Sequence, residues 1–171
     1  MYTILLKTEG TVPSFCIIFH IGNMNYKKNH YDVIHFNTGL WDVVRLSNES
    51  KRCFISCDEY IDNIRRIISR LRFYWESAQI IFATTTSVVE PCKVVADGDT
   101  VLGYRYNSGI SRYNKAVTEM INSIDDMVWI DDLYSASLKL DDERMDKTHF
   151  SSAGYKILAE SVIRSISSCL F

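Results

Sequence analysis

The sequence predicts a single α/β domain over residues 1–171, in which a mainly parallel sheet lies between two helical layers. Short apolar segments alternate along the chain with longer segments whose apolar residues recur at helical spacing, as expected for a three-layer αβα sandwich. The segment Gln79–Thr84 contains an apolar run that is typical of a strand covered on both faces. A chain of 171 residues is long enough to bury a core, and neither a repeat nor an interdomain linker divides it.

The first third of the chain predicts a strand, a helix and a second strand. Tyr2–Leu6 favours a short strand, which the turn residues Gly10–Pro13 end. A helix is predicted from Ser14, directly after the proline, to about Tyr26. Tyr31–Phe36 then has the composition of a strand that ends at Asn37–Gly39.

The middle of the chain predicts a helix, a strand and a loop. Apolar residues recur at helical spacing from Tyr60 to Leu71, and the strand Gln79–Thr84 follows. Val89–Asn107 is predicted as a long loop because it holds a proline and two glycines.

The last third predicts two helices around a strand. A helix over Ile110–Ile124 is followed by a strand over Met127–Ile130. Ser151 is a suitable N-cap for the final helix. The residues of this helix that are predicted to face inward are Tyr155, Leu158, Ala159, Val162 and Ile166.

Charge and composition exclude several classes of partner. The 19 basic and 21 acidic residues give a net charge of −2 without a long block of one sign, so we expect no nucleic-acid and no membrane partner. No segment approaches the roughly 20 apolar residues that span a bilayer. Five irregularly spaced cysteines are typical of a reduced, intracellular chain. The N-terminus lacks a basic signal region, so we expect a cytoplasmic protein, or a secreted one if a leader lies upstream of Met1.

The strongest local signal for chemistry is the segment Asp146–Ser151, in which Asp146 and His149 are three residues apart. An imidazole can take up and return a proton near neutral pH, as a general base must. A carboxylate beside it keeps one ring nitrogen protonated and stabilises the imidazolium that forms. The structural alternative is that Asp146 caps the turn and that His149 is a surface histidine.

A second signal is Asn37, directly after the predicted strand Tyr31–Phe36. Ligands of parallel α/β sheets gather beyond the carboxyl ends of the strands, where a side-chain amide can donate to a developing oxyanion. The same rule marks Gly10 and the loop before the last helix as places of interest. The alternative for Asn37 is an Asn–Gly turn, with Gly39, in which the amide bonds its own backbone.

Other candidate sites are weaker. His20, His30 and His35 are more typical of structural histidines than of ligands, and no set of cysteines or carboxylates has metal-ligand spacing. The sequence also lacks the G-x-x-x-x-G-K-[ST], G-x-G-x-x-G and G-x-S-x-G motifs. We therefore predict no metal and no cofactor.

Taken together and in this order, these segments resemble the SGNH (GDSL-like) hydrolase family. The segment Tyr31–Asp42 looks like the family's block that contains the oxyanion asparagine, here Asn37, and Asp146–Tyr155 looks like its closing D-x-x-H block. Ile80–Thr86 and Tyr113-Asn114 sit where related sequences carry a strand and the start of a helix. The resemblance runs from about Gly10 to the C-terminus. It implies a three-layer αβα fold without a cofactor that hydrolyses esters, often acyl groups on carbohydrates or lipids.

The chain departs from the family at the nucleophile. The family's serine lies in a G-D-S block at the end of the first strand, where this chain has Lys7–Glu9. We align Gly10 with the family's second block, whose glycine amide joins the oxyanion hole. That alignment implies that the first strand is missing and that the domain is truncated at its N-terminus. An Asp–His pair without a hydroxyl cannot form an acyl-enzyme by the family's route. Ser14, close to Gly10, is a candidate substitute.

Three interpretations follow from these residues. The leading one is an SGNH-type serine esterase for a small-molecule or carbohydrate ester, impaired by the missing nucleophile block. In it His149 is the base, Asp146 orients it, and Asn37 and Gly10 are oxyanion donors. The second is a non-catalytic protein that binds a carbohydrate or acyl ligand in the retained cleft. The third is an unrelated flavodoxin-like module, which the absence of a phosphate loop disfavours. The sequence indicates no oligomeric state.

Overall fold

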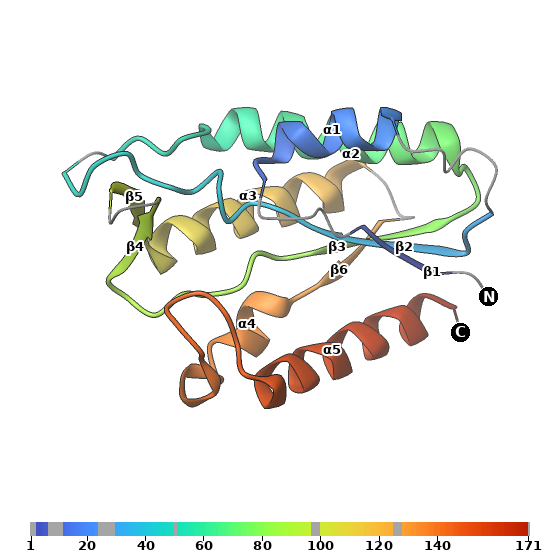
Figure 1. Ribbon diagram of the computed structural model, residues 1–171. Coiled ribbons are helices and arrows are strands. Elements are labelled where there is room, and N and C mark those ends of the chain that lie inside the picture. Colours follow the sequence, from blue (N-terminus) through green and yellow to red (C-terminus); the bar gives the residue numbers. More distant parts are fainter. Residues whose placement is uncertain are drawn as a thin grey trace.

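The computed structural model describes residues 3–6, 12–23, 30–49, 51–96, 100–124 and 128–170 and has one parallel sheet between two helical layers (Figure 1). The elements in chain order are β1 (Thr3–Leu6), α1 (Ser14–Asn23), β2 (Val33–Asn37), α2 (Cys57–Tyr74), β3 (Gln79–Ala83), β4 (Cys92–Val95), β5 (Val101–Arg105), α3 (Asn107–Ile124), β6 (Val128–Asp131), α4 (Leu133–Ser137), a short 3₁₀ helix (Asp141–Glu143) and α5 (Ser152–Leu170). The strand order is β1-β2-β3-β6, and each neighbouring pair is parallel. The predicted three-layer α/β sandwich is confirmed.

The two faces of the sheet carry two separate cores. Helices α1, α2 and α3 lie over one face, and α4 and α5 lie over the other (Figure 1). Because side chains alternate along a strand, neighbouring residues of β2 and β3 enter different cores. The larger core contains Ile34, Phe36, Ile80 and Phe82 of the central strands together with apolar residues of α1, α2 and α3. The smaller core contains Ala83, Leu133, Leu140, Phe150 and Leu158.

Helix α2 forms where the apolar spacing predicted a helix. The side chain of Ser56 accepts a hydrogen bond from the backbone N–H of Glu59 at 3.2 Å and so caps the first turn. Tyr60, Ile64, Ile67, Ile68 and Leu71 are buried in the larger core. Arg65, Arg66 and Arg70 are exposed on its outer side, as its amphipathic pattern requires.

The predicted loop over Val89–Asn107 is wrong, because the structure has an antiparallel hairpin of β4 and β5 there. The burial of β4 alternates, with Cys92 and Val94 buried and Lys93 and Val95 exposed, but Val95 is apolar, so the sequence shows this alternation only in part. Four residues are too few for that alternation to stand out beside Pro91 and the glycines. The backbone of Tyr104 also pairs with that of Arg45 at 2.8 Å, which joins the hairpin to the segment after β2.

The inward face predicted for the last helix is partly wrong. Leu158 is buried as expected, but Tyr155 and Ala159 are exposed. The buried residues of α5 are Gly154 and Leu158, and Val162, which was also predicted to face inward, is half-buried against the smaller core. The predicted cap is confirmed, since Ser151 Oγ accepts from the backbone N–H of Gly154 at 3.1 Å.

Other predicted boundaries agree within a few residues. Tyr2, Met127 and the predicted end of the first helix at Tyr26 lie outside the described residues. Within the described ranges, no helix combines the length and the apolar character needed to cross a membrane.

Candidate active site

Asp146 and His149 form a hydrogen-bonded pair in the loop before α5. The ring Nδ1 of His149 lies 2.7 Å from Oδ2 of Asp146. The other carboxylate oxygen, Oδ1, accepts the backbone N–H groups of Thr148 at 2.6 Å and His149 at 2.7 Å. The two side chains are 62% and 55% exposed. The carboxylate therefore caps the turn and orients the imidazole at the same time, so the two alternatives drawn from the sequence coexist.

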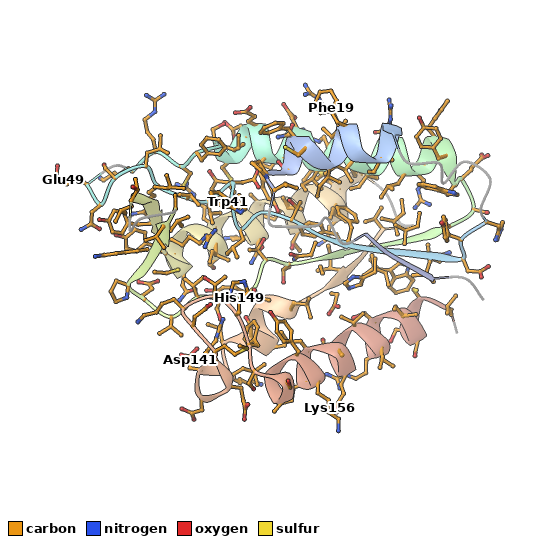
Figure 2. All side chains as sticks on the ribbon, viewed as in Figure 1. Phe19, Trp41, Glu49, Asp141, His149 and Lys156 are labelled. Atoms are coloured by element: carbon orange, nitrogen blue, oxygen red, sulfur yellow. The ribbon has the colours of Figure 1, made fainter. Side chains whose placement is uncertain are left out.

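The loop that carries the pair is closed on itself. The backbone N–H of Met145 donates to the carbonyl of His149 at 2.9 Å. The backbones of Arg144 and Phe150 form an isolated antiparallel β-bridge. Phe150 is buried in the smaller core. His149 thus projects from a short, anchored hairpin, and Figure 2 shows it between the sheet and the layer of α4 and α5.

Arg144 fastens this hairpin to the segment after β3. Its guanidinium donates to the carbonyl of Ser87 at 3.0 Å, to the hydroxyl of Ser87 at 2.8 Å and to the carbonyl of Thr148 at 3.2 Å. The guanidinium also lies 3.9 Å above the ring of Phe150. Only 4% of the side chain is exposed, and burial lowers the pKa of Arg144, while Asp141 and Asp146 act in the opposite direction. Sequence reasoning missed this residue.

The electrostatics of the pair favour an ionised carboxylate. Burial raises the pKa of Asp146, but hydrogen bonds from the backbone and ring of His149 and from the backbone of Thr148 outweigh it and lower the pKa to about 2. Asp146 is therefore an anion near neutral pH. An anion at this position stabilises the imidazolium form of His149 when the ring takes up a proton.

Asn37 lies at the carboxyl end of β2, beside Ala83 of β3. It is two residues after His35, so the two side chains share a face of the sheet. His35 contacts Asp131, which in turn accepts a hydrogen bond from Ser161 of α5 at 3.1 Å. Asn37 therefore faces the layer of α4 and α5, the layer that also holds the His149 loop.

The amide group of Asn37 is engaged by the neighbouring strand. Nδ2 donates to the carbonyl of Ala83 at 2.8 Å and to the carbonyl of Thr84 at 3.0 Å. Both amide hydrogens thus point at main-chain oxygens, so donation to an oxyanion requires one of these bonds to be exchanged. The expected Asn–Gly turn bonding to its own backbone is not what this side chain does.

The residues after β3 connect the two parts of the candidate site. Thr85 donates from its hydroxyl to the carbonyl of Thr38 at 2.8 Å, and its backbone N–H donates to Asn114 of α3 at 2.9 Å. Further along, the backbone N–H of Val89 donates to the carbonyl of Lys147 at 2.9 Å. One short segment therefore contacts the Asn37 turn at its start and the His149 hairpin at its end.

Gly39 allows the turn after β2. Its φ of 128° is a conformation that residues with a side chain rarely adopt. A Cβ at this position would lie 2.4 Å from Oγ1 of Thr85 and 2.6 Å from the hydroxyl of Tyr60. A residue with a side chain at position 39 would therefore be strained both by its backbone conformation and by its contacts.

The structure places Ser14 away from solvent, at the start of α1. Ser14 is completely buried; its hydroxyl donates to Oδ1 of Asp42 at 2.6 Å and accepts from Asn63 at 3.0 Å. Burial raises the pKa of Asp42, while the hydrogen bonds from Ser14 act to lower it. Ser14 begins α1 and holds it against the turn after β2, so the idea of a substitute nucleophile is wrong. Gly10 lies outside the described residues.

The remaining histidines differ in their surroundings. His35 is buried, and its Nε2 lies 3.0 Å from Oδ2 of Asp131, which fits the structural role favoured by the sequence. His30 is exposed beside Asp32, with 3.8 Å between Nδ1 and Oδ1. The side chain of His20 lies outside the described part of the molecule.

Similarity to known proteins was found in sequence and in structure. No family model matches the sequence. A GDSL esterase/lipase from Oryza sativa subsp. japonica is 29% identical over 164 residues, which are 92% of this chain and 55% of the relative. The chain thus spans about half the length of the curated relative that it matches.

Solved structures of esterases share the fold. A putative platelet activating factor from Streptococcus pneumonia superposes with a TM-score of 0.71 at 18% identity, over 90% of this chain and 67% of that one. A carbohydrate esterase family 3 protein from Talaromyces cellulolyticus gives 0.66 at 16% identity, over 92% and 68%. The acetylxylan esterase Axe2 from Geobacillus stearothermophilus gives 0.65 at 18% identity, over 91% and 68%. The chain therefore has the fold of these proteins and is similar in sequence to a GDSL esterase/lipase.

At these identities the structural likeness shows a shared fold, so the family, the activity and the substrate of the chain are proposals. Within the described ranges, no hydroxyl or thiol lies at hydrogen-bond distance from Nε2 of His149. Nor do three histidine, cysteine or acidic side chains gather there as a possible metal site. The predictions of no metal and no cofactor stay predictions.

Proposed function

We propose that the chain carries the acid–base part of an SGNH-type acyl-ester hydrolase, with His149 as general base and Asp146 as the carboxylate that orients it. The observation that carries the proposal is the 2.7 Å contact between Nδ1 of His149 and Oδ2 of Asp146. It is supported by the two backbone N–H groups that fix the carboxylate. With Nδ1 bonded to the carboxylate, Nε2 is the nitrogen left to accept a proton.

The reaction that suits this geometry is acyl transfer from an ester. Nε2 of His149 takes the proton from the attacking hydroxyl as a bond forms to the ester carbonyl carbon. The carbonyl oxygen becomes an oxyanion, for which we propose Asn37 and Gly10 as donors. When the tetrahedral intermediate collapses, the C–O bond to the alcohol breaks and the imidazolium returns its proton to the leaving oxygen. Asp146 remains an anion throughout.

The attacking group is the part of the site that the described residues do not supply. Without the hydroxyl of the family's G-D-S block, the remaining members of such a site give only about 10³–10⁴-fold acceleration over water. We therefore propose an impaired esterase in the form of this chain. We also propose that residues 1–171 form a single SGNH hydrolase-like domain.

We propose a small-molecule or carbohydrate ester as the substrate. Support comes from the carbohydrate esterase of Talaromyces cellulolyticus and the acetylxylan esterase of Geobacillus stearothermophilus, which share the fold. The exposure of His149 and Asp146 also suits an open site that admits a bulky alcohol such as a sugar chain. No nucleic-acid partner is proposed, and cytoplasmic localisation stays a prediction.

Hydrolysis of p-nitrophenyl acetate tests the proposed function. If the imidazole is the general base, His149→Ala and Asp146→Asn are both expected to lower the rate, by a factor that cannot exceed the residual acceleration of about 10³–10⁴-fold. The matched control is His30→Ala, because His30 is also exposed and also lies beside an aspartate. Equal rates for the chain, His149→Ala and His30→Ala would rule out catalysis through His149.

The alternative is a non-catalytic protein that binds a carbohydrate or acyl ligand. The observation that favours it is that no nucleophile stands beside His149 in the described part of the chain. In that case acetylated xylo-oligosaccharides bind without being deacetylated, and His149→Ala changes affinity and not turnover. Calorimetric titration with product analysis separates the two functions, because only the esterase releases acetate.

A further inference from the structure

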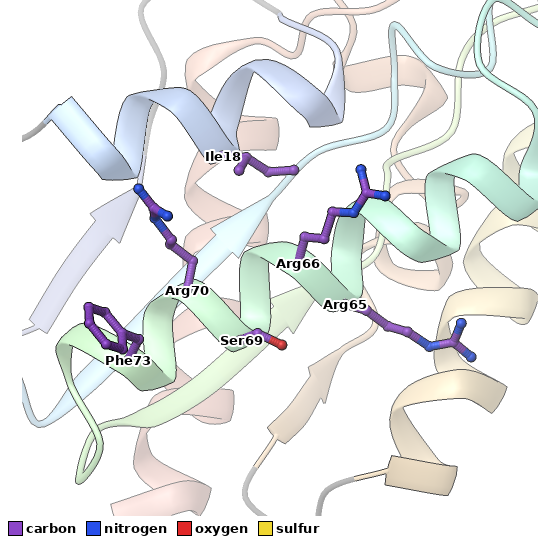
Figure 3. A pocket seen from close by; sticks show the side chains of 6 residues that line it. All are labelled: Ile18, Arg65, Arg66, Ser69, Arg70 and Phe73. Carbon is purple, nitrogen blue, oxygen red and sulfur yellow. The ribbon is translucent and has the colours of Figure 1, made fainter.

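A groove between α1 and α2 is lined by cationic and apolar side chains. Its volume is about 500 Å³, and it is lined by Ile18, Arg65, Arg66, Ser69, Arg70 and Phe73 (Figure 3). This volume falls within the range of clefts that hold small organic ligands, about 300–1,000 Å³. Helices α1 and α2, whose side chains line the groove, lie on the face of the sheet opposite α4 and α5 (Figure 1), and His149 lies on the side of α4 and α5 (Figure 2).

The groove concentrates positive charge. Figure 3 shows Arg66 and Arg70 extending from α2 toward α1, and Arg65 pointing away from α1. Arg65 is paired with Asp62 at 3.0 Å, in an exposed contact of small energetic value. No acidic side chain of the described chain pairs with Arg66 or Arg70. Although the whole chain has a net charge of −2, the groove has a local excess of about two positive charges, from Arg66 and Arg70.

The spacing of Arg66 and Arg70 suits one compact anion, and the guanidinium of Arg70 also lies 5.5 Å over the ring of Tyr74. Arg66 and Arg70 are four residues apart on a helix, which places their Cβ atoms about 5–6 Å from each other on one side. Two guanidinium forks at that separation can converge on the oxygens of a single group. A phosphate monoester carries a charge of about −1.5 to −2 with three acceptor oxygens, and so matches two cations better than one carboxylate does.

The walls of the groove are apolar beside the arginines. Phe73 is 79% exposed although it is a large hydrophobic residue. Ile18 of α1 is half-buried and faces the groove from the other helix. A ligand with an apolar substituent would remove the ring of Phe73 from water while its charged group meets Arg66 and Arg70.

We propose that this groove binds an organic phosphate monoester that carries an apolar substituent. Arg66 and Arg70 hold the phosphate, Ser69 lies next to it on the same helix, and Ile18 and Phe73 cover the apolar part. The site is separate from the candidate active site and does not depend on the proposed function. Its ligand is a soluble phosphate ester or the exposed head group of a phosphate-bearing lipid, which share this chemistry.

Binding of 1-naphthyl phosphate, followed by calorimetry, tests the proposal. The Arg66→Gln/Arg70→Gln double variant is expected to bind at least about ten-fold more weakly, and Phe73→Ser to bind more weakly than the unsubstituted chain. Inorganic phosphate and 1-naphthol, which each lack one half of the ligand, are expected to bind more weakly than the ester. The control is Arg164→Gln, an exposed arginine of α5, which is expected to leave binding unchanged.

A second arm identifies the source of the phosphate. Vesicles of phosphatidylcholine, with and without phosphatidic acid, are sedimented with the chain and with the double variant. Retention that requires both phosphatidic acid and the two arginines supports the proposal and assigns a lipid head group. The proposal is overturned if neither probe binds, if the double variant binds as tightly as the unsubstituted chain, or if Arg164→Gln weakens binding equally.

Discussion

Replacing Arg144 by methionine tests whether the buried guanidinium holds the His149 hairpin in place. Methionine has a similar length but no hydrogen-bond donor, so the substitution removes the charge and the bonds with little change in volume. The guanidinium makes three hydrogen bonds, of 2.8 to 3.2 Å, to Ser87 and to the carbonyl of Thr148. Ser87 is itself 1% exposed, so water cannot readily replace the lost donors.

The expected loss of stability follows from these bonds. A hydrogen bond to a charged group contributes about 1.5–3 kcal/mol, and a buried acceptor left unpaired costs about 1–3 kcal/mol. Removing a buried cation also relieves its desolvation, which offsets part of that cost. The free energy of unfolding should therefore fall by about 2–4 kcal/mol, and the melting temperature by roughly 5–15 °C for a domain of this size.

Urea unfolding followed by tryptophan fluorescence measures the change, with Arg164→Met as the matched control. Arg164 is exposed on α5, so its substitution is expected to stay within about 0.5 kcal/mol of the unsubstituted chain. In Arg144→Met the Nδ1–H proton of His149 should also exchange faster with solvent, as seen by NMR, because the hairpin that presents it is released. A variant as stable as the control, with an unchanged imidazole signal, would refute the role given to Arg144.

Three further predictions concern the surroundings of the site. Gly39→Ala should destabilise the fold by about 1–3 kcal/mol in a thermal melt, because of its φ of 128° and the contacts that a Cβ would make. Gly109→Ala, in α3 with open space around its Cβ, should stabilise it by up to about 1 kcal/mol; a loss of equal size in both variants would contradict the argument. Ser14→Ala removes the buried hydrogen bond to Asp42 and should lower the free energy of unfolding by about 1–3 kcal/mol, while any esterase rate stays unchanged. Loss of the rate in a folded variant would show that Ser14 is the nucleophile. The pKa of Asp146 is about 2 in the folded chain, below the ordinary 3.8, so the stabilisation by this carboxylate is complete above about pH 4 and is lost as the pH falls through about 2. NMR titration of the carboxyl carbon checks this value, and an ordinary pKa would show that the bonds to His149 and Thr148 are absent in solution.

The elements that could be predicted from the sequence are those whose signal is local. Helix α2 shows its apolar period from Tyr60 to Leu71, and β3 is apolar from Ile80 to Ala83, so the sequence predicts both. The hairpin of β4 and β5 was missed because four or five residues give too short an alternation. The facing of α5 was misjudged because a helix with apolar residues on several sides does not define which of them meets the sheet.

The contacts of the candidate site also fall into those between residues close in sequence, which could be predicted, and those between distant residues, which could not. Asp146 and His149 are three residues apart, so their contact could be predicted from spacing and turn geometry. The bond of Asn37 to Ala83 spans 46 residues, and that of Arg144 to Ser87 spans 57. Contacts at such separations depend on strand register and loop packing, which one sequence does not reveal. The engaged amide of Asn37 and the buried guanidinium therefore became visible only in the fold.

The segment after β3 holds Asn37 and the His149 hairpin in one arrangement, although these residues are far apart in the sequence. At its start, the carbonyls of Ala83 and Thr84 accept hydrogen bonds from the amide of Asn37. At its centre, the hydroxyl of Ser87 accepts a hydrogen bond from the guanidinium of Arg144. At its end, the backbone N–H of Val89 donates to the carbonyl of Lys147. A displacement of this segment would therefore move the amide of Asn37 and the imidazole hairpin together, since both are bonded to it. For the proposed esterase this means that His149 and Asn37 keep a fixed separation even though each is exposed. For a binding protein it means that the same rigid edge persists without a nucleophile, because none of these contacts requires one.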